Sequence, residues 1–438
     1  MPAQLDRLSA QDVQILRLER GPIRGHICKI VLLEAPAPSV DELRAHIGAR
    51  LDAAPRLRRR LVKTPLNLAR PIWADDPDFD IARHVVDAGT APREQLNEFV
   101  AYLMAERLDR DHPLWRMDVL NMEEDGTALI WRIHHCMCDG ATSVKLGEAL
   151  LWSDDESDHE RPPCDWRAGE QPSAARLMTS AVASRLQRKP GGEGDTSARV
   201  SRAAVKRELR RTAIRSSLDA SIGSARSVAF ASAPLEATKE AGKAIDPKVT
   251  LNDMVLAITA GGIRKWLERT HGPTEGIRVK VPVSLHHAGE KEGTGNRDSY
   301  FFVDLPVDEP DPIARLRKIN AETADRKLDH DAEALYRLGL HRTVAHYAMS
   351  PRVFTFNVSN VPGPRADVYV KGSRVRALYS IAEVAQHHAL RVSVISAAGN
   401  LFFGLCADRD AVTELDVLAD GLDHARDELL ARDAHPGA

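Results

Sequence analysis

The sequence has few of the features that mark disulfide-rich, membrane-spanning or nucleic-acid-binding proteins. Its five cysteines are odd in number and mostly scattered, so no disulfide framework is expected. No apolar run approaches the ~18 residues that a transmembrane helix needs, and the N-terminal residues lack a basic-then-apolar signal pattern. The formal net charge of -3 lacks the basic excess usual in nucleic-acid-binding proteins. We expect a reduced cytoplasmic protein and no nucleic-acid partner; peripheral attachment to a membrane or to lipid inclusions stays open.

The overall composition, with 43% hydrophobic and 28% charged residues, is typical of a soluble globular protein. The chain of 438 residues is long enough for two domains. We assign residues 1–152 and 218–438 to an N-terminal and a C-terminal α/β domain. Residues 153–217 begin with an acidic cluster and become rich in Arg, Ser and Ala. This composition predicts a crossover linker, partly helical or disordered, that buries little surface. Its basic run at 202–215 is either a membrane contact or, as is more usual, a solvated charge run.

Short strands alternate with helices in both expected domains. Ser9 with Asp12, and Thr250 with Asp253, have the spacing of capping boxes at helix starts. Asp125-Gly126 is a hairpin signal between two strands. Apolar periodicity predicts helices at 41–51, 94–106, 250–269, 311–329 and 415–432, and strands at 27–34, 114–120, 127–135, 228–233, 278–284, 374–381, 391–396 and 400–407.

Two adjacent histidines, His134 and His135, stand at the end of the strand predicted at 127–135. Because side chains alternate along a strand, His135 is expected on a wholly apolar face and His134 on a mixed one. A neutral imidazole in a dry channel is a suitable general base, since burial disfavours its charged form. Asp139 and Gly140 follow after three residues. Asp139 is therefore placed to cap the next helix or to pair with a cation.

The same stretch permits other interpretations. His134, His135, Cys136 and Cys138 are all metal-ligand types, but adjacent residues rarely reach one ion and the chain has no second half-site, so we expect no metal. A catalytic thiol at Cys136 or Cys138 is weakly supported, because no helix N-terminus directly precedes either residue. Judged from spacing alone, a strand that ends in two histidines without a catalytic role is as well supported as a catalytic site.

The pattern His-His-x-x-x-Asp-Gly at 134–140 resembles the motif of the CoA-dependent acyltransferase superfamily, which includes chloramphenicol acetyltransferase and peptide-synthetase condensation domains. Pro113-Leu114-Trp115, Asn252-Asp253 and Asn360-Val361-Pro362-Gly363-Pro364 then match further motifs of one bacterial family in order. Nearly the whole chain resembles the wax ester synthase/acyl-CoA:diacylglycerol acyltransferase family. It departs from the family at Cys136-Met137-Cys138, where small or aliphatic residues are frequent.

The resemblance implies two α/β domains like chloramphenicol acetyltransferase, each a mixed sheet with flanking helices, and an interdomain channel. It implies an O-acyltransferase that moves a long-chain acyl group to a fatty alcohol or diacylglycerol. The donor is acyl-CoA as a co-substrate, with no cofactor and no acyl-enzyme. His135 is then the general base, with His134 and Gly140 in the same motif. Asp139 is then a structural aspartate paired with an arginine, for which Arg58 and then Arg297 are the candidates.

Other positions follow from the resemblance as substrate or interface residues. Asn252 and Asp253 would line the domain interface opposite the histidine, although both residue types also favour helix N-termini. The remaining candidates at this interface are Cys136, Cys138, Ser359 and Asn360. Two other functions stay open: a condensation-like enzyme with a carrier-protein-bound acyl donor, and a non-catalytic lipid-surface protein that retains the fold.

Overall fold

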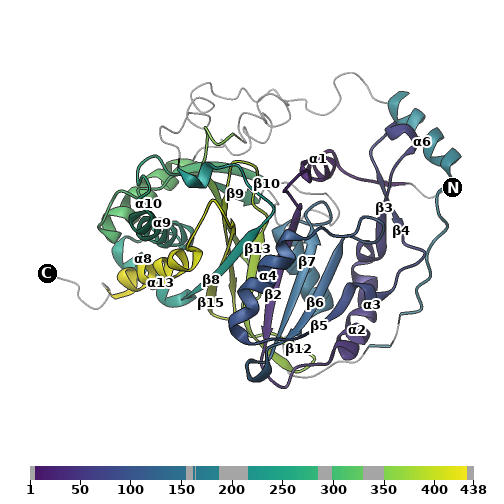
Figure 1. The fold of residues 1–438 in the computed structure, drawn as a ribbon, viewed down its shortest axis with the longest axis horizontal. Coiled ribbons are helices and arrows are strands. Elements are labelled where there is room, and N and C mark those ends of the chain that lie inside the picture. Colours follow the sequence, from purple (N-terminus) through teal and green to yellow (C-terminus); the bar gives the residue numbers. More distant parts are fainter. Residues whose placement is uncertain are drawn as a thin grey trace.

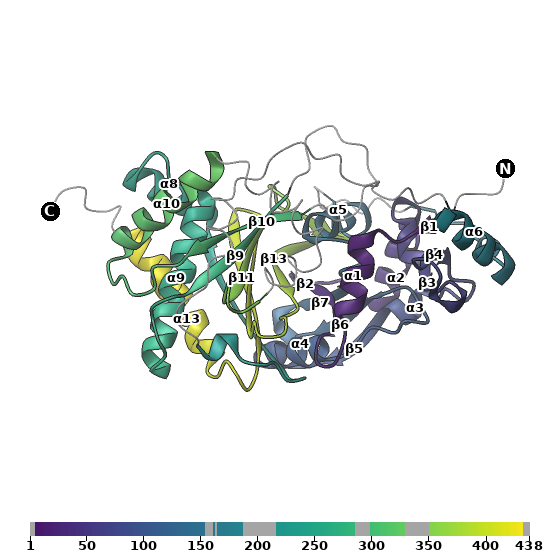
Figure 2. The same cartoon turned by 90° about the horizontal axis from the view of Figure 1, so that it is seen from above.

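A computed structural model describes residues 5–153, 161–162, 164–186, 216–284, 298–328 and 350–431. The chain forms two α/β halves whose sheets stand next to each other at the centre of the molecule (Figure 1). Helices flank the sheets on both outer sides, as the view from above also shows (Figure 2). The predicted α/β class with mixed sheets is therefore confirmed.

The sheet of the N-terminal half has six strands in the order β12-β13-β2-β7-β6-β5. β5 runs parallel to β6, and the other neighbouring pairs are antiparallel. Two of the strands, β12 and β13, belong to the C-terminal part of the sequence, so the sheet crosses the division that we placed between 152 and 218. The bounds are β2 (His26–Leu33), β5 (Val85–Thr90), β6 (Trp115–Asn121), β7 (Thr127–His134), β12 (Tyr369–Val370) and β13 (Ser373–Ala382).

The sheet of the C-terminal half also has six strands, in the order β10-β9-β11-β14-β15-β8. Its central strand β11 is parallel to both neighbours, and the other pairs are antiparallel. The strands are β8 (Arg226–Pro234), β9 (Arg278–Ser284), β10 (Asp298–Asp304), β11 (Phe356–Pro362), β14 (Leu390–Ala397) and β15 (Asn400–Asp408). The helices beside it are α8 (Leu235–Ile245), α9 (Leu251–Thr270), α10 (Pro312–Leu328) and α13 (Leu415–Ala431).

Local signals in the sequence are found where they were expected. Both capping boxes form, with Ser9 at the start of α1 (Ala10–Leu18) and Thr250 at the start of α9. Gly126 has a positive φ of 85° in the turn between β6 and β7. The helix α4 (Leu96–Ala105) lies within its predicted range, and α2 (Val40–Gly48) begins one residue before its own. In the part of the chain that the structure describes, no helix has the length and apolarity to span a bilayer.

The crossover segment is docked against the N-terminal half at the residues that the structure describes. The Cys164 thiol donates to Asp52 at 2.8 Å, and the Arg58 guanidinium lies 4.5 Å from the centroid of Trp166. Further on, α6 (Ala174–Leu186) covers the small sheet β1-β4-β3 (Asp6–Arg7, Ile72–Asp75 and Arg59–Val62) through the buried Leu177. Most of these residues nevertheless stay exposed or half-buried, and only Leu177 and Ala181 are buried among those described, so the prediction that this segment buries little is confirmed for them. The basic run at 202–215 lies outside the described residues.

Candidate active site at the histidine turn

The two histidines have different backbone settings. β7 ends at His134, and His135 begins the turn that follows, so strand alternation does not extend to it. The strand predicted at 127–135 therefore ends one residue early. The position of the His135 side chain on an apolar face stays a prediction, because strand alternation does not fix it. Instead, the His135 backbone N–H donates to the Gly25 carbonyl at 2.9 Å, which fixes the start of the turn. The His135 side chain is half-buried.

His134 is buried and holds the turn through both ring nitrogens. Its Nδ1 accepts from the backbone N–H of Cys136 at 3.1 Å. The proton of a neutral ring must then sit on Nε2, which lies 3.2 Å from Oε2 of Glu19. His134 thus ties the turn to the residue that follows α1, and its catalytic role stays a prediction.

Glu19 is a site residue that the sequence did not single out. It is buried and also receives hydrogen bonds from Arg110, while Arg107 Nε lies 3.7 Å from its Oε1. Burial on its own would raise the pKa of Glu19, but the hydrogen bonds from His134 and Arg110 bring it below its ordinary value. Glu19 is therefore a charged acceptor, and it orients His134 from a position 115 residues away in the chain.

Gly25 must be a glycine for two reasons. Its φ of +74° is in the left-handed region, where a side chain is disfavoured. A Cβ on Gly25 would also lie 2.8 Å from Nε2 of His134 and 3.4 Å from Cβ of Glu19. The backbone therefore passes directly against the His134–Glu19 pair while its carbonyl holds His135.

The protonation state of His135 follows from its surroundings. Burial, and after it the positive charge of Arg391, lower its pKa to about 4. Arg391 belongs to β14, so His135 is under the electrostatic influence of the C-terminal half. The imidazole is consequently neutral at physiological pH, as a general base must be before it accepts a proton.

Asp139 has the capping role that its position predicts. It is buried at the N-cap of α5 (Gly140–Leu150), and its Oδ1 accepts from the Thr142 backbone N–H at 2.7 Å. The buried Lys29 of β2 is a nearby cation: burial lowers its pKa to about 8, and the charge of Asp139 opposes this fall. The carboxylate therefore fixes the end of the turn, and Lys29 helps to balance its charge.

The arginine expected to brace Asp139 is found elsewhere. Arg58 Nη2 donates to Oδ1 of Asp52 at 2.6 Å, and its guanidinium covers Trp166. The predicted Arg58–Asp139 pair is therefore wrong. A basic run seen in sequence does not show which acid each guanidinium will reach. Arg297, the second candidate, lies outside the described residues.

Cys136 and Cys138 lie in the hydrophobic core on either side of Met137. Burial raises the pKa of both thiols above the ordinary value, so they stay protonated. Within the described ranges, no group of three His, Cys, Asp or Glu side chains has metal-binding geometry. The influence of both cysteines on substrate choice stays a prediction.

The end of the turn lies next to the C-terminal half. A Cβ on Gly140 would be 3.1 Å from Cγ2 of Val361 in β11, so a glycine lets the two elements approach. Ser359 and Asn360 precede Val361 on the same strand and are half-buried. The structure thus brings these two predicted interface residues close to the start of α5.

Asp253 makes its contacts within the C-terminal half. Its carboxylate completes the capping box with Thr250 and accepts from Asn320 at 3.0 Å and Thr323 at 2.6 Å, which joins α9 to α10. Because Asp253 is fully buried in these contacts, the helix-terminal alternative accounts for it. A substrate role for the half-buried Asn252 stays a prediction.

Comparisons with protein families match both parts of the chain. Residues 8–255 match the wax ester synthase/diacylglycerol acyltransferase catalytic domain, and residues 294–429 match the WS/DGAT C-terminal domain. A probable diacylglycerol O-acyltransferase of Mycobacterium tuberculosis is 30% identical over 431 residues, which cover 92% of this chain and 90% of the relative. A putative diacylglycerol O-acyltransferase of the same species is 30% identical over 472 residues, covering 97% of each chain.

Solved structures show the same fold at lower sequence identity. The wax ester synthase/diacylglycerol acyltransferase from Marinobacter aquaeolei aligns with a TM-score of 0.74 and 21% identity, covering 98% of this chain and 100% of that one. The first condensation domain of the calcium-dependent antibiotic synthetase aligns with a TM-score of 0.64 and 15% identity, covering 100% and 98%.

Proposed function

Because the chain belongs to the wax ester synthase/diacylglycerol acyltransferase family and is an acyltransferase, we propose that it moves a long-chain acyl group from CoA to a fatty alcohol or diacylglycerol. We propose His135 as the general base and direct transfer without an acyl-enzyme. The observation that carries this proposal is a neutral imidazole on a residue whose backbone N–H is held by the Gly25 carbonyl, in a turn whose two thiols stay protonated.

The proposed step moves one proton and exchanges one bond. His135 takes the proton of the acceptor hydroxyl while the oxygen attacks the thioester carbonyl carbon. The C–O bond forms, the tetrahedral intermediate collapses with cleavage of the C–S bond, and the proton passes from the imidazolium to the leaving CoA sulfur. Burial and Arg391 both disfavour the imidazolium, so the proton is expected to stay on His135 only briefly.

Turnover of the purified full chain tests the substrates directly. Palmitoyl-CoA is supplied with a panel of fatty alcohols and with diacylglycerol, and esters and free CoA are measured together. We expect equal amounts of ester and CoA for at least one acceptor. Ester formation with a carrier-protein-bound acyl donor, and none with acyl-CoA, would favour the condensation-like alternative. The absence of product with every donor would favour a non-catalytic lipid-surface protein.

The pH profile of kcat/KM tests the state of the base. A base acts in its deprotonated form, so activity is lost as the pH falls through its pKa. With a His135 pKa of about 4, the rate at pH 5.5 should stay within about two-fold of that at pH 7.5. An unperturbed histidine would give a midpoint near 6.5. Circular dichroism at each pH separates titration from unfolding, and a midpoint at the unperturbed value in folded protein would contradict the predicted environment.

We also propose peripheral contact with a membrane or lipid inclusion, because the acceptors named above are lipids. Sedimentation of the purified chain with vesicles that contain diacylglycerol would measure this contact.

A further inference from the structure

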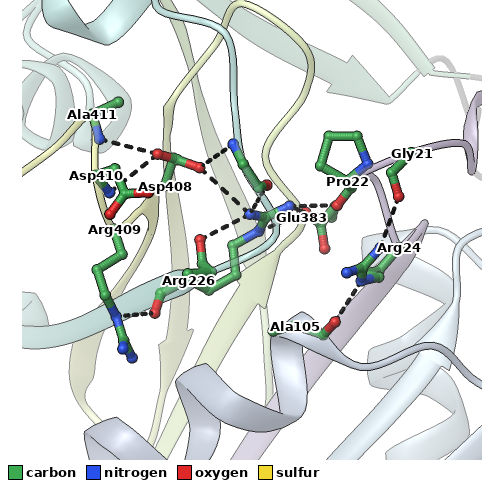
Figure 3. Close-up of polar contacts among 12 residues, drawn as sticks. Gly21, Pro22, Arg24, Ala105, Arg226, Glu383, Asp408, Arg409, Asp410 and Ala411 are labelled. Carbon is green, nitrogen blue, oxygen red and sulfur yellow. Dashed lines mark hydrogen bonds and ion pairs between the residues drawn. The ribbon is translucent and has the colours of Figure 1, made fainter.

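A buried arginine joins the two halves of the molecule. Arg226 is the first residue of β8, and its side chain has no exposed surface. Nε and Nη2 donate to Oε1 of Glu383 at 2.9 and 2.7 Å, as Figure 3 shows. Glu383 follows β13, whose strand pairs with β2, and its backbone N–H donates to the His26 carbonyl at 3.3 Å. The carboxylate is therefore held by the N-terminal sheet.

All N–H groups of the Arg226 guanidinium have acceptors. Besides the two bonds to Glu383, Nη1 donates to the carbonyls of Gly223 at 2.8 Å and Ala225 at 3.0 Å, and Nη2 donates to the Pro22 carbonyl at 2.7 Å. Asp408 lies on the other side, with Oδ2 3.7 Å from Nη1 (Figure 3). Because the guanidinium is planar and its donors have fixed directions, these acceptors define its position.

Pro22 belongs to the short loop at residues 20–25, which leads into β2 and contacts the histidine turn through Gly25. The loop is tied to the end of α4 by Arg24, which donates to the Ala105 carbonyl, and internally by a bond from Arg24 to the Gly21 carbonyl at 2.9 Å (Figure 3). Its last residue, Gly25, accepts the backbone N–H of His135. The bond from Arg226 to Pro22 thus links β8 to the residue that fixes His135.

A buried ion pair of this kind is better suited to setting geometry than to adding stability. Desolvation of two charges offsets much of their attraction, so such pairs contribute little net stability while allowing few arrangements. Burial raises the pKa of Glu383 to about 7, and the charge of Arg226 opposes this rise. The pair therefore carries a large desolvation cost at a place where both halves meet the 20–25 loop.

We propose that Arg226 and Glu383 are positioning residues that dock the C-terminal half onto the 20–25 loop and thereby hold Gly25 in place for His135. The effect on turnover rests on the proposed function of His135, but the effect on the loop does not. Loss of the pair should release the loop while leaving the two sheets folded.

The test compares Arg226→Met and Glu383→Gln in the full chain with wild type. For each variant, kcat, KM for acyl-CoA and amide hydrogen exchange at residues 20–26 and 135 are measured. We expect kcat to fall by about ten-fold or more with KM within about two-fold, because geometry and not ground-state binding is lost. Amide hydrogen exchange at the backbone N–H of His135 should become faster in both variants. Arg226→Lys should have a higher kcat than Arg226→Met but a lower one than wild type, because lysine keeps the charge and lacks the planar set of donors.

Arg315→Met provides the matched control. Arg315 is also a buried arginine, but Glu428 and the Glu309 carbonyl, its partners, both belong to the C-terminal half. This variant should leave kcat per folded molecule and exchange at His135 unchanged. If Arg226→Met fails to fold, Arg226→Lys and Glu383→Gln decide the matter. Wild-type exchange at His135 in the folded Arg226 and Glu383 variants would overturn the proposal. Faster exchange with unchanged turnover would support the docking role and contradict the catalytic role of His135.

Discussion

Replacement of His135 by Ala is expected to abolish acyl transfer while leaving the fold intact. A positioned general base contributes about 10²–10⁴-fold to a rate, so kcat should fall by at least about 100-fold. The fold should survive because the bond that places this residue in the turn runs from its backbone N–H to the Gly25 carbonyl, and alanine keeps it. The measurement is ester formation under saturating acyl-CoA and acceptor, with a melting curve for each protein.

His424→Ala is the control for loss of a histidine. His424 lies on α13 with 56% of its side chain exposed, far in sequence from the turn, and its removal should change neither turnover nor melting temperature. Ester formation at the wild-type rate by folded His135→Ala protein would end the general-base proposal.

Replacement of Gly25 by Ala should give the second largest loss. The added Cβ would lie 2.8 Å from Nε2 of His134, a distance that cannot persist, so the imidazole has to move away from Glu19. Because His134 also accepts the Cys136 backbone N–H, that movement displaces the whole turn. We expect kcat to fall by about 100-fold, since small misplacements of reacting groups cost factors of this size. Steady-state kinetics measures this loss.

Gly89→Ala separates the contact from the backbone strain. Gly89 has a φ of +79°, close to that of Gly25, but no atom lies within 4 Å of the position of its Cβ. Both variants should therefore lose about 1 kcal/mol of unfolding free energy from the left-handed conformation. Only the Gly25 variant should lose turnover. Equal kinetics for the two variants would show that the contact with His134 does not position the turn.

Local interactions could be predicted from the sequence because both partners lie within one helical turn. The capping boxes of Ser9 and Thr250 and the N-cap of Asp139 are of this kind, and all three are confirmed. The hairpin between β6 and β7 was also predictable, since its turn residues adjoin the strands that they connect. The motif at residues 134–140 was recognisable in the sequence for a similar reason: its residues lie close together in the chain.

Contacts between distant segments could not be predicted in this way. Glu19 reaches His134 across 115 residues, and nothing about a glutamate at the end of a helix indicates such a partner. The arginine run at 56–60 gave no information on pairing, and Arg58 reached Asp52, six residues away, instead of Asp139. The predicted strand extended one residue beyond β7, so alternation could not fix the side-chain direction of His135.

The sheet of the N-terminal half has a consequence for synthesis in the cell. Lys29 on β2 and Ser380 on β13 are neighbours in this sheet but lie 351 residues apart in the chain. At ribosomal rates of about 5–20 residues per second, roughly 20–70 s pass between their emergence. During that time one edge of β2 has no partner strand, and such an edge can pair with other chains. An N-terminal fragment that lacks β13 would therefore keep this edge of β2 without its partner, and we expect it to associate with other chains more readily than the full chain.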